Sequence, residues 1–527
     1  MDRSDINVYL PLYSRNAMRP EGDKMKTENK ASCQLVLSTI VTTLFLMVAV
    51  LAPSVANAQV KAFPTAEGYG ANSVGGRGGV HIPVTNLNDS GPGSFRAALS
   101  ATGPRIITFR VSGTINLLSN VYITGEANSF VTVAGQSSPG GIQLKDGGVI
   151  VYNGAHDVTI RHLRVRYGAP AVARDTNSFL IYTDGLNPPV YNVIIDHCSL
   201  QWATDELLTI YNKSRNITVQ WCLIAEGTNT GHSEGLPHNA GLLVHGEIGK
   251  GEIITVSAHH NLLAHAAIRS PTLDRTDIID FRNNVIYNWG STSPPTFVGN
   301  NALLAGDLAD NRTARFNFVN NHYIAGANSS TSGFFFLANG ASSRDRGGTK
   351  VYSAGNWSPT CPSGCANDWD NGFSDLDGYP PNIVPAQESK YRVSTPFSVP
   401  QVVTDPTASI KSKVTATVGA YKPSRDSLDT RIVNDVLNGT GNIANIGAGG
   451  PWPTLTGGTP PVDTDGDGMP DSWELAHGLN PKDPSDGSRI ASNGYTNVEN
   501  YLNELAGDPI PGGGSPPPPP SNLQVSP

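Results

Sequence analysis

Five segments in the middle of the chain repeat one pattern. In each, apolar and polar residues alternate up to a short polar turn, and a second apolar run follows. The segments are residues 191–200, 216–224, 254–263, 278–287 and 316–324. Alternation with a period of two is typical of β-strands and not of helices. Each segment is therefore predicted to be a strand, a turn and a second strand.

The turns of these five segments align with one another. The aligned positions are Cys198, Cys222, Asn261, Asn284 and Asn321, at spacings of 24, 39, 23 and 37 residues. Repeats of roughly 20–50 residues are typical of solenoids. Because no helical pattern separates the short strands, we predict an all-β fold, a right-handed single-stranded parallel β-helix. In this fold the asparagines would form an inward amide ladder, and Cys198 would lie directly above Cys222.

A solenoid has open ends that must be covered. Residues 93–99 form the one clear short helical segment near the start, with Ser94 as a possible N-cap, and we expect them to close the first coil. The expected domains are the β-helix at 59–446, a linker at 447–462, a small Asp-rich module at 463–506 and a Pro/Gly-rich tail at 507–527. That tail is expected to act as a spacer to a partner or to a further domain.

Composition and charge narrow the range of partners. The chain has 527 residues with 56 Gly, 39 Pro and only 15% charged residues, which argues against a coiled coil or a charged disordered chain. Residues 451–527 hold ten acids and two bases, whereas the first 450 residues hold 34 of each, so the net charge of −8 belongs to the tail. A neutral main body without a basic run argues against nucleic acid and anionic membranes as partners. We expect a monomer.

The first 58 residues are predicted to be a secretory signal. An apolar stretch at 33–52 follows two lysines, and the small residues Val55–Ala58 form a cleavage pattern before Gln59. We expect translation to start at Met25 and the mature protein to be extracellular, without a membrane partner. A membrane anchor is the alternative, because the apolar stretch is just long enough to span a bilayer.

Four cysteines remain after removal of this segment. Cys361 and Cys365 lie in a Gly/Pro-rich loop and predict a small disulfide in an oxidising compartment, with metal binding as the alternative. Cys198 and Cys222 predict two buried thiols in a stack, with a disulfide as the alternative.

Short motifs follow one another in a fixed order along the predicted solenoid. They occupy residues 193–200, 204–206, 259–262 and 269–271. With them the chain resembles the pectate lyases of the pectin-lyase-like β-helix superfamily, over about residues 60–355. The resemblance implies a secreted enzyme that cleaves 1,4-linked polygalacturonate by β-elimination with Ca²⁺ as cofactor. A lyase for another polyuronate and a non-catalytic polysaccharide-binding β-helix are the alternatives; a hydrolase is disfavoured, because the coils lack paired aspartates.

The resemblance also implies a calcium site in the cleft. Asp175 and Asp205 map onto the metal-binding acids of the family. Where the family usually has a further acid the chain has Thr209, and Glu206 is expected to replace that acid. A Ca²⁺ ion at these acids would neutralise the uronate carboxylate and stabilise the charge that develops during elimination. Asp196, within the best motif, is expected to point inward as a structural acid.

The base that removes the C5 proton maps onto Arg269. A guanidinium is normally always charged, so this role requires an unusual environment or a water relay. A second arginine of the family is absent at Thr272, and Arg275 is expected to substitute for it in binding substrate. His238 and His260 are further candidates for substrate contact.

The acidic tail contains an independent calcium motif. Its acids stand at positions 1, 3, 5, 9 and 12 of a loop with Gly468 at the sixth, which is the spacing of an EF-hand-type loop. The predicted ligands of this structural calcium site are Asp463, Asp465, Asp467, Met469, Asp471 and Glu474.

Overall fold

The computed structural model describes one compact unit that begins at Gln59. The described residues are 59–185, 187–235, 238–246, 253–290, 303–307, 314–329, 335–339, 348–360, 367–371, 373–377, 382–385 and 388–509. The predicted signal segment and the predicted Cys361–Cys365 disulfide lie outside the described residues.

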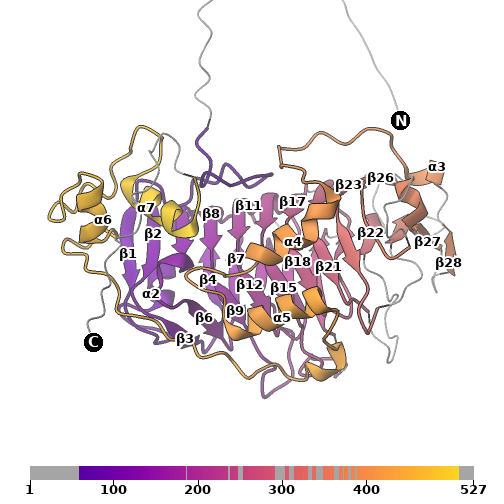
Figure 1. Cartoon of the computed structure of the whole chain (residues 1–527), viewed down its shortest axis with the longest axis horizontal. Coiled ribbons are helices and arrows are strands. Elements are labelled where there is room, and N and C mark those ends of the chain that lie inside the picture. The colour runs from indigo at the N-terminus through magenta and orange to yellow at the C-terminus, as the bar shows by residue number, and fades with distance from the viewer. Residues whose placement is uncertain are drawn as a thin grey trace, which may run out of the picture. The chain divides into compact units, whose positions relative to one another are not determined.

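Three β-sheets that run along the length of a solenoid form the body of this unit (Figure 1). The first sheet contains, in spatial order, β1 (Val80–Val84), β2 (Arg105–Phe109), β5 (Val131–Ala134), β8 (His156–Arg161), β11 (Tyr191–Asp196), β14 (Arg215–Gln220), β17 (Thr255–His259), β20 (Ile278–Arg282), β23 (Ala314–Val319) and β26 (Thr349–Ala354). The second contains β3 (Gly113–Asn116), β6 (Ile142–Lys145), β9 (Arg164–Arg166), β12 (Ser199–Gln201), β15 (Leu223–Ala225), β18 (Leu262–Ala264), β21 (Val285–Tyr287) and β24 (His322–Ile324). The third contains β4 (Val121–Thr124), β7 (Val149–Tyr152), β10 (Phe179–Tyr182), β13 (Glu206–Tyr211), β16 (Ala240–His245), β19 (Thr272–Asp274), β22 (Leu303–Asp307), β25 (Phe335–Asn339), β27 (Phe373–Asp377) and β28 (Asn382–Pro385).

Each coil contributes one strand to each sheet, and its strands pair in parallel with those of the coils before and after it. Among the described strands only β27 and β28 pair antiparallel. This is the predicted right-handed parallel β-helix, the hand expected for parallel crossover connections.

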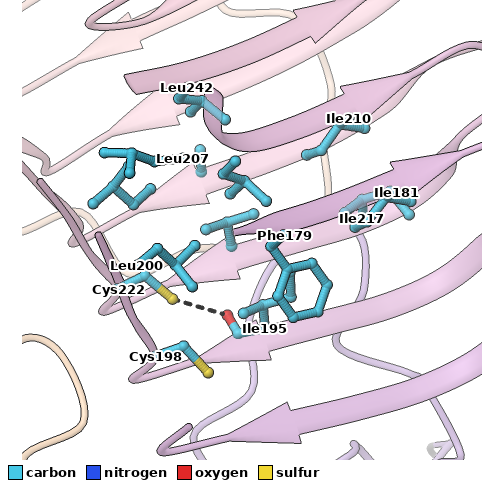
Figure 2. Close-up of a cluster of buried hydrophobic side chains, with 14 of the residues drawn as sticks. Phe179, Ile181, Ile195, Cys198, Leu200, Leu207, Ile210, Ile217, Cys222 and Leu242 are labelled. Carbon is cyan, nitrogen blue, oxygen red and sulfur yellow. Dashed lines mark hydrogen bonds between the residues drawn. The ribbon is translucent and has the colours of Figure 1, made fainter. Parts of the chain in front are cut away.

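The core consists of apolar side chains that occupy the same position in successive coils. Val158, Val193, Ile217 and Val256 are aligned in the first sheet, and all four are buried in the main cluster. Figure 2 shows part of this interior, where residues from all three sheets point toward one another. The strand alternation seen in the sequence therefore places every second residue inside the solenoid.

The predicted turn stack is confirmed. Cys198 and Cys222 are buried free thiols, and the amide ladder continues from them along the solenoid. Asn284 Nδ2 donates to Asn321 Oδ1 at 3.0 Å, and Asn261 Nδ2 donates to Asn284 Oδ1 at 3.0 Å. Asn356 adds a further rung, accepting from Asn321 Nδ2 at 2.9 Å. These side chains satisfy buried polar groups at the turn between the first and second sheets.

The predicted N-terminal helix is also confirmed, as α2 (Phe95–Ser100). The Ser94 side chain accepts a hydrogen bond from Ala97 N, and Phe95 and Leu99 belong to the main core cluster. The helix therefore closes the first coil.

Asp196 does not point inward, so that expectation is wrong. Ile195 fills the core, and the alternation of β11 turns Asp196 to the outer face of the first sheet. There it is buried and pairs with Arg161 at 2.8 Å. It is nonetheless a structural acid, because the chain covers this face; Phe63, for example, lies under the Arg161 guanidinium.

Helices from the second half of the chain cover two of the sheets (Figure 1). These helices are α3 (Glu388–Tyr391), α4 (Thr407–Thr417), α5 (Ser427–Asn438), α6 (Asp471–Ala476) and α7 (Asn497–Ala506). The described 3-10 turns are η1 (Glu126–Asn128) and η2 (Gly135–Ser137) in the first coils, and η3 (Asp368–Asn371) and η4 (Ile443–Asn445) later in the chain. The apolar faces of α4 and α5 pack on the second sheet, and that of α7 packs beside the first. The described helices are all too short and too polar to cross a bilayer.

Candidate active site

The predicted cleft residues come from consecutive loops that join the second sheet to the third. Asp175 lies between β9 and β10, Asp205 and Glu206 lie at the start of β13, His238 lies between β15 and β16, and Arg269 lies between β18 and β19. Because the coils stack, residues that are far apart in sequence meet at this edge.

Two threonines hold the first two loops together. The backbone N–H of Thr176 donates to Thr204 Oγ1 at 3.0 Å, and the N–H of Thr204 donates to Thr176 Oγ1 at 3.0 Å. The N–H of Asp205 donates to the carbonyl of Thr176 at 3.0 Å. This reciprocal bonding sets Asp175 beside Asp205.

Asp175 and Asp205 meet around a pair of histidines. His232 Nε2 lies 3.2 Å from Asp175 Oδ1 and 3.8 Å from Asp205 Oδ1, and His238 Nε2 lies 3.2 Å from Asp205 Oδ1. The two imidazoles stack with their centroids 4.3 Å apart. Sequence reasoning missed His232, which lies only six residues before the predicted His238 in the same loop.

Arg269 lies against the same acids. Its Nη1 is 3.5 Å from Asp205 Oδ1 and forms an ion pair with Glu206. Its backbone has a φ of 56°, a left-handed conformation that is costly for a residue with a Cβ. Gly241 lets this backbone approach β16, because a Cβ there would lie 2.6 Å from the Arg269 carbonyl oxygen.

Burial shifts the protonation equilibria in this cluster. It lowers the pKa of the Arg269 guanidinium from its ordinary value, although the charges of Asp205 and Asp274 oppose the shift. It raises the pKa of Asp205, against the opposing charges of His238 and Arg269. It also lowers the pKa of His238. Each shift favours the neutral form of its group.

Glu206 is oriented by two neighbours. Its Oε2 accepts hydrogen bonds from Asn177 Nδ2 at 2.9 Å and from Thr209 Oγ1 at 3.0 Å. The carboxylate of Glu206 thus reaches the side chain of Thr209, the position at which the resemblance implies a further acid. Asp175 is half exposed; burial raises its pKa, but hydrogen bonds from Ser233 outweigh that effect and the pKa is lowered.

Two predicted residues lie away from this cluster. Arg275 contacts His245 at the far end of the third sheet, where His245 pairs in register with Tyr211, five residues along β13 from Glu206. At about 3.3 Å per residue, this separation is on the order of 16 Å. His260 follows β17 in the first sheet, is buried, and pairs with Asp405 at 2.9 Å.

The donor set at the edge fits a hard divalent cation. Ca²⁺ prefers carboxylate oxygens. Asp175 and Asp205 present them beside His232, and Asp205 and Glu206 present them beside Arg269. Asp205, His232 and His238 also place ligand atoms within 4.8 Å of one another. The cluster thus combines acids, imidazoles and a partly buried guanidinium.

The predicted tail residues form a second acidic cluster. Carboxylate oxygens of Asp463, Asp465 and Asp467 lie within 4.8 Å of one another. Glu474 joins Asp467, together with Asp486, a residue that the loop spacing did not include. Of the remaining two predicted ligands, Asp471 uses its carboxylate to accept from Thr464. Met469 stands at position 7, where such a loop supplies a backbone carbonyl oxygen, so its side chain is free to be buried in an apolar cluster.

Comparison with known proteins identifies close relatives. The chain is 34% identical over 466 residues to a probable pectate lyase C of Aspergillus fumigatus, covering 87% of this chain and 97% of the relative. It is 34% identical over 462 residues to a probable pectate lyase C of Aspergillus terreus, covering 84% and 94%. A solved Bacillus subtilis pectate lyase mutant is 15% identical, with a TM-score of 0.45 over 70% of this chain and 100% of that chain. No family model matches the chain.

Proposed function

The chain belongs to the pectate lyase family of polysaccharide lyases, and from this premise we propose that it is a secreted, calcium-dependent enzyme that cleaves de-esterified polygalacturonate by β-elimination, with Arg269 as the base. The observation that carries this proposal is the position of Arg269. Its guanidinium is partly buried against Asp205 and Glu206, and Asp205 in turn contacts both histidines, at the edge where a polymer could lie along the stacked loops.

The reaction requires that a weakly acidic C–H bond be broken. Arg269, as the neutral guanidine, would take the C5 proton and become a guanidinium. The C4–C5 double bond would form as the C4–O bond breaks, and the departing glycosidic oxygen would be protonated by Arg269 or by water. The lowered pKa of Arg269 supports this role, because an arginine with its ordinary pKa is almost entirely protonated near neutral pH and only its neutral form can accept a proton. When bound, Ca²⁺ would neutralise the uronate carboxylate and stabilise the developing charge.

The neighbours of Arg269 would position it and hold the cofactor. Asp175, Asp205 and Glu206 would bind the calcium ion, with Glu206 kept in place by Thr209. His238 would contact substrate from the wall of the site, stacked on His232. We also propose that His260 and Arg275 contribute to binding only if the polymer extends beyond this cluster, since both lie away from it.

Absorbance of unsaturated uronate ends is the direct test. The chain is assayed on pectate, methylated pectin and alginate, with calcium and with EGTA. We expect unsaturated ends from pectate only when calcium is present. Reducing ends without unsaturation would indicate a hydrolase, no product would indicate a binding protein, and cleavage of alginate alone would overturn the substrate.

Arg269→Lys tests the base. We expect a loss of turnover on the order of 10²–10⁴-fold with little change in KM, because the role is at the transition state. Arg215→Lys, on the first sheet beside Tyr191, is the matched control and should keep full turnover. A loss mainly in apparent affinity would make Arg269 a binding residue.

The N-terminal segment supports the proposal of secretion. We propose that residues 1–58 are removed on export and that the mature chain begins at Gln59. The intact mass of protein recovered from the medium tests this, and a retained apolar segment in the membrane fraction would favour the anchor instead.

A further inference from the structure

Several buried carboxylate oxygens in the tail module lack a partner. Within the described part of the chain, no hydrogen bond reaches Asp465 Oδ2, Asp467 Oδ2, Asp486 Oδ1 or either carboxylate oxygen of Glu474. Glu474 is fully buried, and the exposed fractions of Asp467 and Asp486 are 6% and 2%. Unpaired buried carboxylates are strongly unfavourable, so this group requires a positive partner.

The geometry points to one hard divalent cation at this place, bound independently of the proposed cleft chemistry. Its ligands are Asp463, Asp465, Asp467, Glu474 and Asp486. Five carboxylates supply the oxygen donors and the charge that Ca²⁺ prefers. Asp486 lies outside the 12-residue motif, twelve residues after Glu474, and it enters the site because the chain folds back over the loop.

Two local features explain why Asp486 is a ligand and Asp471 is not. The Asp471 carboxylate accepts from Thr464 N at 2.7 Å and from Thr464 Oγ1 at 2.6 Å, so both of its oxygens are used within the loop, and it is not among the acids whose oxygens gather within 4.8 Å of one another. Gly487 lets the returning segment approach, because a Cβ at this position would lie 2.4 Å from Asp467 Oδ2.

The cation site is built against the first coils of the solenoid. His81 of β1 lies 2.8 Å from the carbonyl oxygen of Gly466, and Arg110 forms an ion pair with Asp463 at 3.2 Å. Met469 packs with Ile106 of β2 in one apolar cluster. An ion that orders this loop would therefore also fasten the module to the first sheet, and its binding would stabilise both.

Calcium binding by the full chain tests the site. Protein freed of metal with EGTA is titrated with calcium alone by isothermal calorimetry, for wild type, Glu474→Gln, Asp486→Asn and Asp483→Asn. Asp483 is the matched control, because its side chain is 38% exposed and accepts from Ser485 outside the cluster. We expect the first two variants to lose a binding component that wild type and Asp483→Asn retain. Asp205→Ala should leave this binding component in place. The result for the tail site is therefore independent of the result for the cleft proposal.

Thermal unfolding gives a readout that a merely structural role would not show. In EGTA, Glu474→Gln and Asp486→Asn should melt at or above the wild-type temperature, because each removes repulsion among buried carboxylates. With calcium, both should melt below wild type. Unchanged calcium binding by Asp486→Asn would show that Asp486 is not a ligand. Equal destabilisation of the variants with and without calcium would refute the proposed cation site.

Discussion

Replacing Asn284 with alanine should remove the central rung of the amide ladder. The side chain is fully buried, and its Nδ2 donates to Ala258 O at 2.9 Å and to Asn321 Oδ1 at 3.0 Å. Its Oδ1 accepts from Asn261 N at 2.9 Å and from Asn261 Nδ2 at 3.0 Å. The substitution therefore removes four hydrogen bonds at one place.

The expected cost follows from which partners are left without a bond. Asn261 Nδ2 still donates to Val219 O, and Asn321 Oδ1 still accepts from Asn284 N, so each of these losses is worth about 0.5–1.5 kcal/mol. The Asn261 N–H loses its acceptor while buried, which costs about 1–3 kcal/mol. The Ala258 carbonyl oxygen also loses a donor, which is worth about 0.5–1.5 kcal/mol more. We expect the free energy of unfolding to fall by about 3–7 kcal/mol in total.

Urea unfolding followed by tryptophan fluorescence measures this loss, and hydrogen exchange tests its origin. The Asn261 amide should lose protection in Asn284→Ala. Asn445→Ala, at an exposed turn, is the control and should change stability by less than about 0.5 kcal/mol. A loss below about 1 kcal/mol, or an unchanged exchange rate at Asn261, would refute the reasoning.

Three further changes test other parts of the molecule. Asp205→Ala should raise the calcium concentration needed for half-maximal cleavage of pectate, and an unchanged titration would remove Asp205 from the metal site. Asp429→Asn should lower the free energy of unfolding by about 3 kcal/mol in urea, because it leaves buried Arg166, 2.8 Å away, with one carboxylate partner fewer; a change under 1 kcal/mol would contradict this. Burial favours neutral Asp435, but hydrogen bonds led by that from His265 hold its pKa at about 2. This pKa lies below the ordinary 3.8, so the ionised Asp435 stabilises the fold by up to about 2 kcal/mol above pH 4, and this stabilisation is lost toward pH 2. In Asp435→Asn the urea midpoint should therefore vary less between pH 4 and pH 2 than in wild type.

The repeat was visible in the sequence because its information is local. A strand, a turn and a second strand recur within about ten residues, so the coil and the positions of Asn261, Asn284 and Asn321 follow from alternation alone. The outward direction of Asp196 follows from the same alternation, which places Ile195 inside, so that prediction misassigned the register. The burial of Asp196 on the outer face depends on the distant segment around Phe63, which no local pattern encodes.

Local sequence patterns did not reveal where the outer helices pack, nor that His232 and Asp486 belong to the candidate sites. The position of α5 on the second sheet depends on buried pairs such as Arg164 with Asp426, which join residues 262 positions apart. His232 and Asp486 lie in irregular loops, where no spacing rule applies. The EF-hand-type spacing also included Asp471, whose bond to Thr464 is set by the fold of the loop and not by its position in the motif.

The last described segment of the chain lies on its earliest coils, and this has a consequence for biogenesis. Asp508 accepts from Thr65 Oγ1 at 2.5 Å and pairs with Arg161 at 2.8 Å, and Glu499 pairs with Arg77 at 3.0 Å. A nascent chain would lack these partners of the two arginines until residues 499–508 had emerged from the ribosome or translocon. Coils made first would thus be completed last, and a prematurely terminated chain would present uncovered cations that quality-control proteases could recognise.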